Sequence, residues 1–462
     1  MDGFTLSAAL KDRARKVLGL DGLEALPTAL VTRAEQLWRL DGFAANVPFT
    51  NPMFVPMGPV ADIGMLYEAV ATVVRRHGAL RTRLAVQNDR AIQIVEDWKI
   101  SRLETVDVLQ SALADNSLDQ KSAVSEFTQG TINLYVQESF QCRAFRDEQG
   151  NVTLGFLAHG FFADAWSSQI LFREVRAAYA ALANREKFNF NPALQFADYA
   201  LAQRRSLDRD LESHLSYWRG KLEPMPRSRL PYDRQTETGR RGRSYFFVDE
   251  DSVARLAAIS QANRISLTLV LMAIYQLALA RWSGQSEILS AAYTADRVRP
   301  EFQNTIGFLV TNMPVCGHFE GGDQFLPYLR NFAKDFYGSY AHRELSCELY
   351  DVIFSPAAPF CATVFNFVPL QKNFFDSEQH AIEPFAGTIV APDSSRPALY
   401  RDIYLGLAQY PNGILGKLFY NADRFTPAGM ETFIQHFRSV IQTALSNPDV
   451  KLRELVGTAP SP

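Results

Sequence analysis

The sequence contains few cysteines, and their arrangement excludes several classes of protein. Only four occur among 462 residues, and they show neither the Cys-x-x-Cys spacing of metal sites nor the density of small secreted domains held by disulfides. We therefore expect reduced thiols, no bound metal and a cytoplasmic location. The four residues are Cys142, Cys316, Cys347 and Cys361.

Other signatures are missing as well. No run of about 20 apolar residues is present, and the basic residues near the N-terminus are not followed by the apolar core of a signal peptide, so no membrane association is expected. The formal net charge of −3 argues against binding to nucleic acid, which needs clustered positive charge. Glycine-rich phosphate loops, Gly-x-Ser-x-Gly elbows and His-Glu-x-x-His motifs are absent, which argues against nucleotide hydrolases, serine hydrolases and zinc enzymes that use them.

The composition is that of a chain with a large core and mixed secondary structure. Hydrophobic residues make up 47% of the chain and aromatic residues 12%, which suits roughly two to three units of ordinary domain size. Hydrophobic periodicity predicts helices over 60–76, 165–182, 193–222, 251–263, 267–283 and 427–445. Alternating runs predict strands over 82–95 as a pair, 136–145, 152–158, 244–248, 288–293, 305–314, 362–367, 403–409 and 414–420. This order indicates a mixed α/β pattern that occurs twice.

One polar segment joins a predicted strand to a predicted helix. It reads His159-Gly160-Phe161-Phe162-Ala163-Asp164-Ala165-Trp166-Ser167. Because a lone histidine in an apolar segment is usually a core residue, this segment alone is weak support for catalysis.

Seven further segments give the polar segment its context. They are Arg76–Arg81, Phe196–Gln203, Tyr217–Trp218, Leu230–Arg234, Arg297–Glu301, Ile306–Asn312 and Phe419–Phe425. Together with 159–167 they resemble, in order and at similar spacing, the RHExLR, HHxxxDG, DYAxWQ, YW, LPxDR, RxRPE, IGxFxN and YNxxLF motifs of nonribosomal peptide synthetase condensation domains. The resemblance runs from about residue 26 to about residue 457.

The resemblance implies an α/β fold of two chloramphenicol-acetyltransferase-like lobes in a V arrangement, with a tunnel at their interface. We expect an N-terminal extension at 1–24 that forms a capping helix or a docking helix for a partner synthetase. An N-terminal lobe at 25–185, a connector at 186–240 and a C-terminal lobe at 241–462 follow. Met1 and the family-like ending favour a stand-alone chain, and we expect a monomer.

The same resemblance implies what the polar segment does. In the family, two substrates arrive on the 4'-phosphopantetheine arms of carrier proteins, and an amine or hydroxyl of one attacks the thioester of the other. The second motif histidine accepts a proton or positions the nucleophile, and Gly160 stands in its place here. The catalytic candidates are therefore the Gly160 position, His159 and Ser167. Neighbouring strand residues face opposite ways, so we expect His159 to bond backbone groups rather than to replace the missing base.

Asp164 matches the motif aspartate and Arg297 matches the first arginine of RxRPE, and the resemblance implies that they form a structural ion pair. The missing side chain at position 160 leaves room beside Trp166 and Ser167 for a bulkier substrate or a water. Candidates for lining the tunnel, or for buried structural polar groups, are Trp166, Tyr293, Thr294 and Asn312.

Three functions remain open. The leading hypothesis is acyl transfer from a carrier-protein thioester to an amine or alcohol in nonribosomal peptide or hybrid natural-product biosynthesis, because orientation alone can supply much of the rate. The alternative is a protein without bond-forming activity that binds carrier proteins or recruits a tailoring enzyme. Cyclisation or chain release ranks third, because the heterocyclisation branch has an aspartate where His159 stands.

No carrier motif of the Leu-Gly-Gly-x-Ser type and no adenylation signature is present. We expect this chain to bind no cofactor of its own, and the phosphopantetheine arm to arrive on acyl or peptidyl carrier proteins. The other expected partner is a small-molecule or carrier-bound nucleophile.

Overall fold

The computed structural model describes two compact units. The N-unit comprises Arg15–Arg209 and Ala295–Val310, and the C-unit comprises Met1–Ala14, Asp210–Thr294 and Thr311–Pro462. The described residues are 8–18, 20, 34, 50–60, 62–87, 90–97, 104–107, 123–128, 130–186, 190–319, 322–354, 359–369, 388–397 and 401–457.

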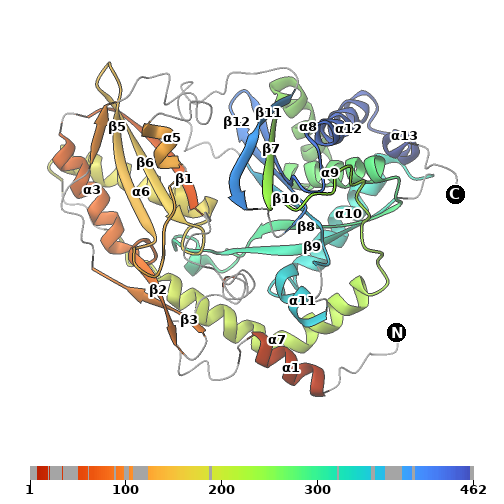
Figure 1. The fold of residues 1–462 in the computed structure, drawn as a ribbon, viewed down its shortest axis with the longest axis horizontal. Helices are drawn as coiled ribbons and strands as arrows, with labels where there is room; N and C mark the ends of the chain where they lie inside the picture. The colour runs from red at the N-terminus through yellow and green to blue at the C-terminus, as the bar shows by residue number, and fades with distance from the viewer. Residues whose placement is uncertain are drawn as a thin grey trace. The chain divides into compact units, whose positions relative to one another are not determined.

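The N-unit is built on a four-stranded sheet with the order β1-β6-β5-β4 (Figure 1). Both β1 (Thr50–Pro59) and β5 (Phe140–Arg146) pair antiparallel with β6 (Asn151–His159), and β4 (Thr105–Asp107) pairs parallel with β5. The last six residues of β6 are all buried. Such continuous burial is expected of a strand that is covered on both faces.

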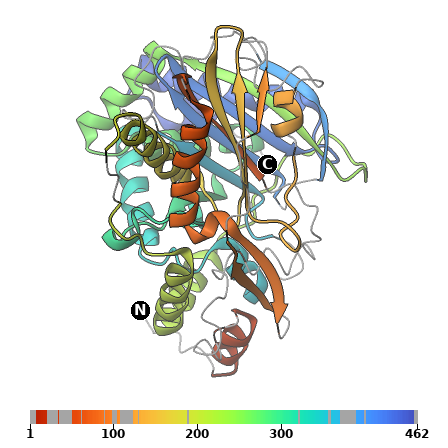
Figure 2. The same ribbon diagram turned by 90° about the vertical axis from the view of Figure 1, so that its left-hand side faces the viewer.

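Helices supply that cover: α3 (Ile63–Arg76), α5 (Ala123–Thr128) and α6 (Ala165–Ala183). α3 and α6 lie side by side (Figure 2). On one face of the sheet, Phe172 of α6 stacks on Phe156 of β6 with 5.7 Å between ring centroids. On the other face, Phe127 of α5 meets Phe145 of β5 edge-on at 5.6 Å. The remaining elements of the N-unit are the hairpin of β2 (Thr82–Gln87) and β3 (Arg90–Val95), and the 3-10 helices η2 (Gly78–Arg81) and η3 (Pro300–Phe302).

The C-unit contains a seven-stranded sheet with the order β11-β7-β13-β12-β10-β8-β9 (Figure 1). Its strands are β7 (Arg240–Asp249), β8 (Glu287–Ala295), β9 (Val310–His318), β10 (Thr363–Val368), β11 (Thr388–Pro397), β12 (Ile403–Tyr410) and β13 (Gly413–Asn421). The β11-β7-β13-β12 pairs are antiparallel, whereas β10 pairs parallel with both β12 and β8. A mixed sheet of this kind confirms the predicted α/β class.

Helices pack on one face of the sheet of the C-unit. They are α8 (Glu250–Asn263), α9 (Leu267–Ser283), α10 (Phe325–Tyr340), α11 (Cys347–Phe354), α12 (Pro427–Ser446) and α13 (Leu452–Val456). The middle of α9 is buried all round, as expected of a helix at the centre of a packed layer. Along β12, residues alternate between fully buried and half-buried positions. The sheet therefore has a face that packs on helices and a second, half-buried face.

Two helices contain residues of both units. α7 (Phe196–Leu222) is continuous through residues 209 and 210, and α1 (Ala8–Leu18) contacts it through the ion pairs Lys11–Glu212 and Arg15–Asp208. α1 falls within the predicted extension at 1–24, of which residues 1–7, 19 and 21–24 lie outside the described residues. The segment 295–310 groups with the N-unit, although the sequence places it inside the expected lobe at 241–462. The lobe boundaries stay a prediction.

Two predicted strands are wrong at their starts. The strand expected at 305–314 begins only at Val310, because the backbone before it bonds to the loop around Asp164 instead of to a neighbouring strand. The strand expected at 136–145 begins at Phe140, since Val136 and Gln137 belong to a turn closed by N–H groups that donate to the carbonyl of Asn133.

Within the described part of the chain, no helix alone is long and apolar enough to cross a membrane. Only α8 and α9 taken together reach the length and composition of a span, and a bend of 109° separates them.

Candidate functional site: the loop between β6 and α6

The candidate site begins where β6 ends. The backbone N–H groups of Phe162 and Ala163 donate to the carbonyl of His159 at 2.9 and 3.2 Å and close a turn. Asp164 then adopts an extended conformation, and its carboxylate accepts from the backbone N–H of Ser167 at 2.7 Å. Aspartate is a favoured N-cap because it satisfies donors at the first turn that have no partner within the helix. The local sequence therefore specifies a strand, a tight turn and a helix start.

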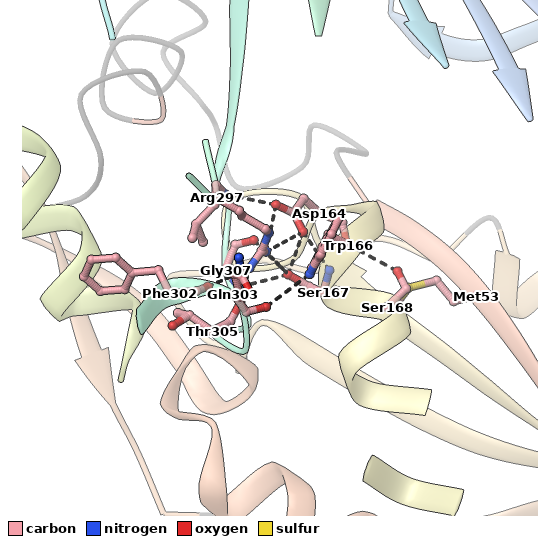
Figure 3. A network of polar contacts seen from close by, with 11 residues as sticks. Met53, Asp164, Trp166, Ser167, Ser168, Arg297, Phe302, Gln303, Thr305 and Gly307 are labelled. Atoms are coloured by element: carbon pink, nitrogen blue, oxygen red, sulfur yellow. Dashed lines mark hydrogen bonds and ion pairs between the residues drawn. The ribbon is translucent and has the colours of Figure 1, made fainter. Parts of the chain in front are cut away.

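Asp164 also forms a buried ion pair with Arg297 (Figure 3). The Nη2 atom of Arg297 donates to Oδ1 at 2.9 Å and to Oδ2 at 3.1 Å, and both side chains are only 3% exposed. Arg297 Nη1 donates to the carbonyls of Thr305 and Phe302 at 2.7 and 3.2 Å. The backbone N–H of Leu309 adds a third kind of donor to Asp164, at 3.0 Å from Oδ2. The pair thus fastens the segment 297–309 to the loop.

Ser167 completes this network. Its hydroxyl lies 2.7 Å from Oδ1 of Asp164 and 2.9 Å from the carbonyl of Gly307, and its one proton serves one of these acceptors at a time. The oxygen accepts from the N–H of Gly307 at 3.0 Å and from Arg297 Nη2 at 3.2 Å. A buried hydroxyl engaged in this way, with a carboxylate rather than a free base beside it, is a structural group and not an activated nucleophile.

His159 is held in a form that does not suit proton transfer at neutral pH. Its side chain is 2% exposed, and its Nδ1 accepts the backbone N–H of Phe161 at 3.2 Å. Burial lowers its pKa to about 3. An Nδ1 that accepts a hydrogen bond in the neutral ring places the proton on Nε2. His159 therefore bonds backbone as its predicted structural role requires, and its Nδ1 lone pair is already used.

A pH titration tests this description of His159. The ring is expected to stay neutral down to about pH 4, so that the unfolded chain, with an ordinary pKa near 6.5, takes up a proton before the native chain does. The contribution of His159 to stability is thus complete above about pH 6.5 and is lost as the pH falls towards the folded pKa. Long-range ¹H–¹⁵N spectra, assigned with His159→Gln, report the ring directly. A ring that titrates between pH 5 and 8 would contradict the buried, neutral assignment.

Gly160 and Trp166 complete the predicted loop. Gly160 is buried in the turn and places no side chain where the family has its second histidine. Trp166 is 38% exposed, and its indole N–H donates to the carbonyl of Gln303 at 3.1 Å. The guanidinium carbon of Arg297 lies 5.8 Å from the centre of its ring. Trp166 therefore packs against the segment 297–303, and its tunnel-lining role stays a prediction.

The other three predicted site residues belong to the C-unit. The ring of Tyr293 lies 5.8 Å from that of Tyr404. Asn312 donates from Nδ2 to Oε1 of Glu348 at 2.9 Å. Among the described residues, the Oγ1 of Thr294 and the Oδ1 of Asn312 are buried without a hydrogen-bond partner. A role of these residues in lining a tunnel also stays a prediction.

Several groups of the network were missed because they are backbone atoms. The N–H and carbonyl of Gly307 and the carbonyls of Phe302 and Thr305 hold Ser167 and Arg297. Their only signal in the sequence is the Ile-Gly-Phe segment at 306–308, which follows the RxRPE-like motif. In the part of the chain that the structure describes, no group of three or more His, Cys, Asp or Glu side chains is arranged to hold a metal ion.

A second buried polar cluster anchors α6 and was also missed. The Nε2 of His77 lies 2.8 Å from Oε2 of Glu174, and the Nε of Arg76 lies 3.2 Å from the same oxygen. His77 is part of the RHExLR-like segment, whose resemblance identified the position but not its partner. The cluster ties the end of α3 to the middle of α6, and so supports the helix that Asp164 caps.

Comparison with known proteins agrees with this geometry. The family model described as Condensation domain matches residues 45–460. One of the proteins that make up linear gramicidin synthase of Brevibacillus parabrevis is 27% identical over 463 residues, which cover 94% of this chain and 9% of that protein. This chain thus spans about a tenth of the length of that relative.

Two solved structures are similar in fold. The X-domain from teicoplanin biosynthesis, solved as a complex with OxyB, has a TM-score of 0.71 at 20% identity, with 93% of this chain and 95% of that chain covered. The first condensation domain of the calcium-dependent antibiotic synthetase has a TM-score of 0.75 at 14% identity, with 92% and 98% covered. These likenesses confirm the chloramphenicol-acetyltransferase-like α/β fold. Because the family match extends over most of the sequence, the chain belongs to the condensation domain family of nonribosomal peptide synthetases.

Proposed function

We propose that this protein binds carrier-borne intermediates of a nonribosomal peptide or hybrid assembly line and holds them for a partner protein, without forming a bond itself. The observation that carries the proposal is the state of the loop between β6 and α6. Gly160 has no side chain, His159 is buried with its Nδ1 engaged and a pKa near 3, and the hydroxyl of Ser167 is fully bonded. A general base needs a free lone pair within hydrogen-bond reach of the substrate and a pKa near the working pH. None of these three positions supplies one.

A fold neighbour supports the same direction. The X-domain from teicoplanin biosynthesis was solved together with a second protein, OxyB. A domain of this fold can therefore serve as a binding partner for another protein. For this chain, the carrier proteins, their phosphopantetheine arms, the partner enzyme, a cytoplasmic location and a monomeric state are all part of the proposal.

Acyl transfer without a histidine base is the second candidate, and one observation favours it. The network of Asp164, Arg297 and Ser167 is complete, so the loop keeps a defined position next to the place of the missing histidine. Attack of an amine on a thioester is an easy reaction, and orientation alone supplies about 7–11 kcal/mol in the best intramolecular cases. Cyclisation or chain release has no observation in its favour.

The deciding experiment follows the acyl group by intact-protein mass spectrometry. A carrier protein loaded with an acyl thioester is incubated with the chain and a panel of amines and alcohols, and binding to the loaded carrier is measured in parallel. The proposal expects carrier binding with no amide or ester above the rate without the chain. Product formation by the wild-type protein would establish the second candidate instead.

The variant Gly160→His tests whether the chain lacks only a base. A holding function predicts no product from the variant, because the rest of a bond-forming site is no longer arranged for one, and an equal or weaker affinity for the loaded carrier, because the new ring takes up the space that Gly160 leaves. Gly220→His, which adds an exposed histidine on α7, is the matched control. New amide from Gly160→His, but not from Gly220→His, would show that the site is intact apart from its base and would contradict the holding function.

A further inference from the structure

The half-buried face of the sheet in the C-unit carries a row of side chains that the loop between β6 and α6 does not involve. The strand registers pair Gly406 with Lys417 and Lys417 with Tyr245, and continue through Asn366 to Tyr293 on the other side. Cross-strand neighbours point to the same face of a sheet. We call these residues the Lys417 row: Tyr293, Asn366, Gly406, Lys417 and Tyr245.

Lys417 lies in this row without a partner. Its neighbour on one side is a glycine, and within the described residues its ammonium group forms no ion pair or hydrogen bond. Lys417 is half-buried, and desolvation is the sole cause that lowers its pKa. A nearby carboxylate would have raised the pKa instead. The positive charge is thus removed from water with nothing in the described chain to compensate it.

A second cation lies beside it. Arg243 is two residues before Tyr245 on β7 and pairs with Phe419, which is two residues after Lys417 on β13. Arg243 is therefore the diagonal neighbour of Lys417 on the same face, at a Cα distance of roughly 7–8 Å. Its Nε is buried and, in the described chain, has no hydrogen-bond partner. Two uncompensated cations this close repel each other, which makes the face costly unless an anion binds.

The carboxylate on this face of β12 is already used. Asp402 lies two pairs further along, and its Oδ2 accepts from the hydroxyl of Tyr232 at 2.8 Å and pairs with Arg424 at 3.4 Å. Aromatic side chains fill the spaces between the charges: the ring of Tyr404 leans over Gly406, and its hydroxyl accepts from Nδ2 of Asn366 at 2.8 Å. The face therefore combines two positive charges with apolar ring surfaces.

We propose that Lys417 and Arg243 bind the oxyanion group, a carboxylate or a phosphate, of a small organic ligand whose apolar part lies on the neighbouring aromatic rings. Arginine offers a planar fork that fits either group, and lysine offers a point charge. A carboxylate would belong to a small-molecule substrate, and a phosphate to a phosphopantetheine arm. The site lies wholly within the C-unit and is independent of whether the chain forms bonds, so its test and that of the proposed function can fail separately.

The competing explanation is that Lys417 covers the aromatic face with its aliphatic stem and extends its ammonium towards water. The two explanations differ in what happens when the charge is removed. If the stem alone matters, Lys417→Met keeps every contact and changes no ligand affinity. If the charge binds an anion, the same variant loses affinity for anions only, and Lys417→Arg retains it.

The experiment is calorimetric titration of the full chain with three probes: hexanoate, 4'-phosphopantetheine and, as a neutral probe, hexanamide. We expect at least one anion to bind, and its dissociation constant to rise about tenfold in Lys417→Met and in Arg243→Met, with Lys417→Arg close to wild type. The anion that responds identifies the source of the oxyanion.

Lys334→Met, which removes an exposed lysine from α10, is the matched control and is expected to leave binding unchanged. Circular dichroism checks that each variant is folded, and Lys417→Met is expected to be at least as stable as wild type because it removes a desolvated charge. Binding of neither anion, or equal affinities in wild type, Lys417→Met and Arg243→Met, would overturn the proposal.

Discussion

Asp164→Ala is expected to lower the free energy of unfolding by about 3–5 kcal/mol, because removing one member of a buried ion pair leaves the other charge without compensation. The Nη2 of Arg297 would lose its acceptor in an environment where the pair is 3% exposed. The N–H groups of Ser167 and Leu309 would lose theirs as well. Urea denaturation followed by circular dichroism measures the loss, and the midpoint should fall with little change in slope.

A control in the same unit separates burial from charge. Asp107 pairs with Arg146 at 3.0 Å, but its side chain is 82% exposed, so Asp107→Ala is expected to change stability by no more than about 1 kcal/mol. The double variant Asp164→Ala/Arg297→Met removes both charges and should lose less than the sum of the two single variants. Equal losses for Asp164→Ala and Asp107→Ala would refute a special role of the buried pair.

The example of this ion pair shows what the sequence allows. The residues of the pair are 133 positions apart, and periodicity gave no reason to bring them together. The resemblance to the condensation family did so, because both positions belong to its motifs. The backbone donors and acceptors around them could not be predicted, since every residue carries the same N–H and carbonyl groups and only the three-dimensional path selects the ones that are used.

Strands and helices were predictable to a different degree from their arrangement. The alternation along 414–420 predicts a strand with Lys417 on its polar side, and β13 confirms it. That side is polar in sequence, yet Lys417 is half-buried and its neighbours come from β12 and β7. Strand order and register follow from packing between distant segments, so the uncompensated charges of the Lys417 row are visible only in the structure.

The second large effect is expected at Gly307, where the loop network meets an aromatic ring. A Cβ at this position would lie 2.2 Å from Cδ2 of Phe196, far inside the contact distance of two carbon atoms. The ring cannot move freely, because Phe196 is 1% exposed and packs against Phe162 and Tyr199. Overpacking a core costs about 1–3 kcal/mol and sometimes more. Gly307→Ala should lie at the upper end of that range, since moving the backbone instead would stretch the bonds from Gly307 to Ser167.

A second glycine makes the sign of this prediction decisive. Gly220 lies exposed in α7, and no atom comes within 4 Å of the place that a Cβ would take there, so Gly220→Ala is expected to raise the free energy of unfolding by about 0.5–1 kcal/mol through helix propensity alone. The same chemical change should thus destabilise the protein at one site and stabilise it at the other, as read from thermal or urea unfolding of both variants. If Gly307→Ala were as stable as wild type, Phe196 would have room to turn aside. The hold of the segment 297–309 on the loop would then rest on the Asp164–Arg297 pair and not on the close approach of Gly307 to the ring.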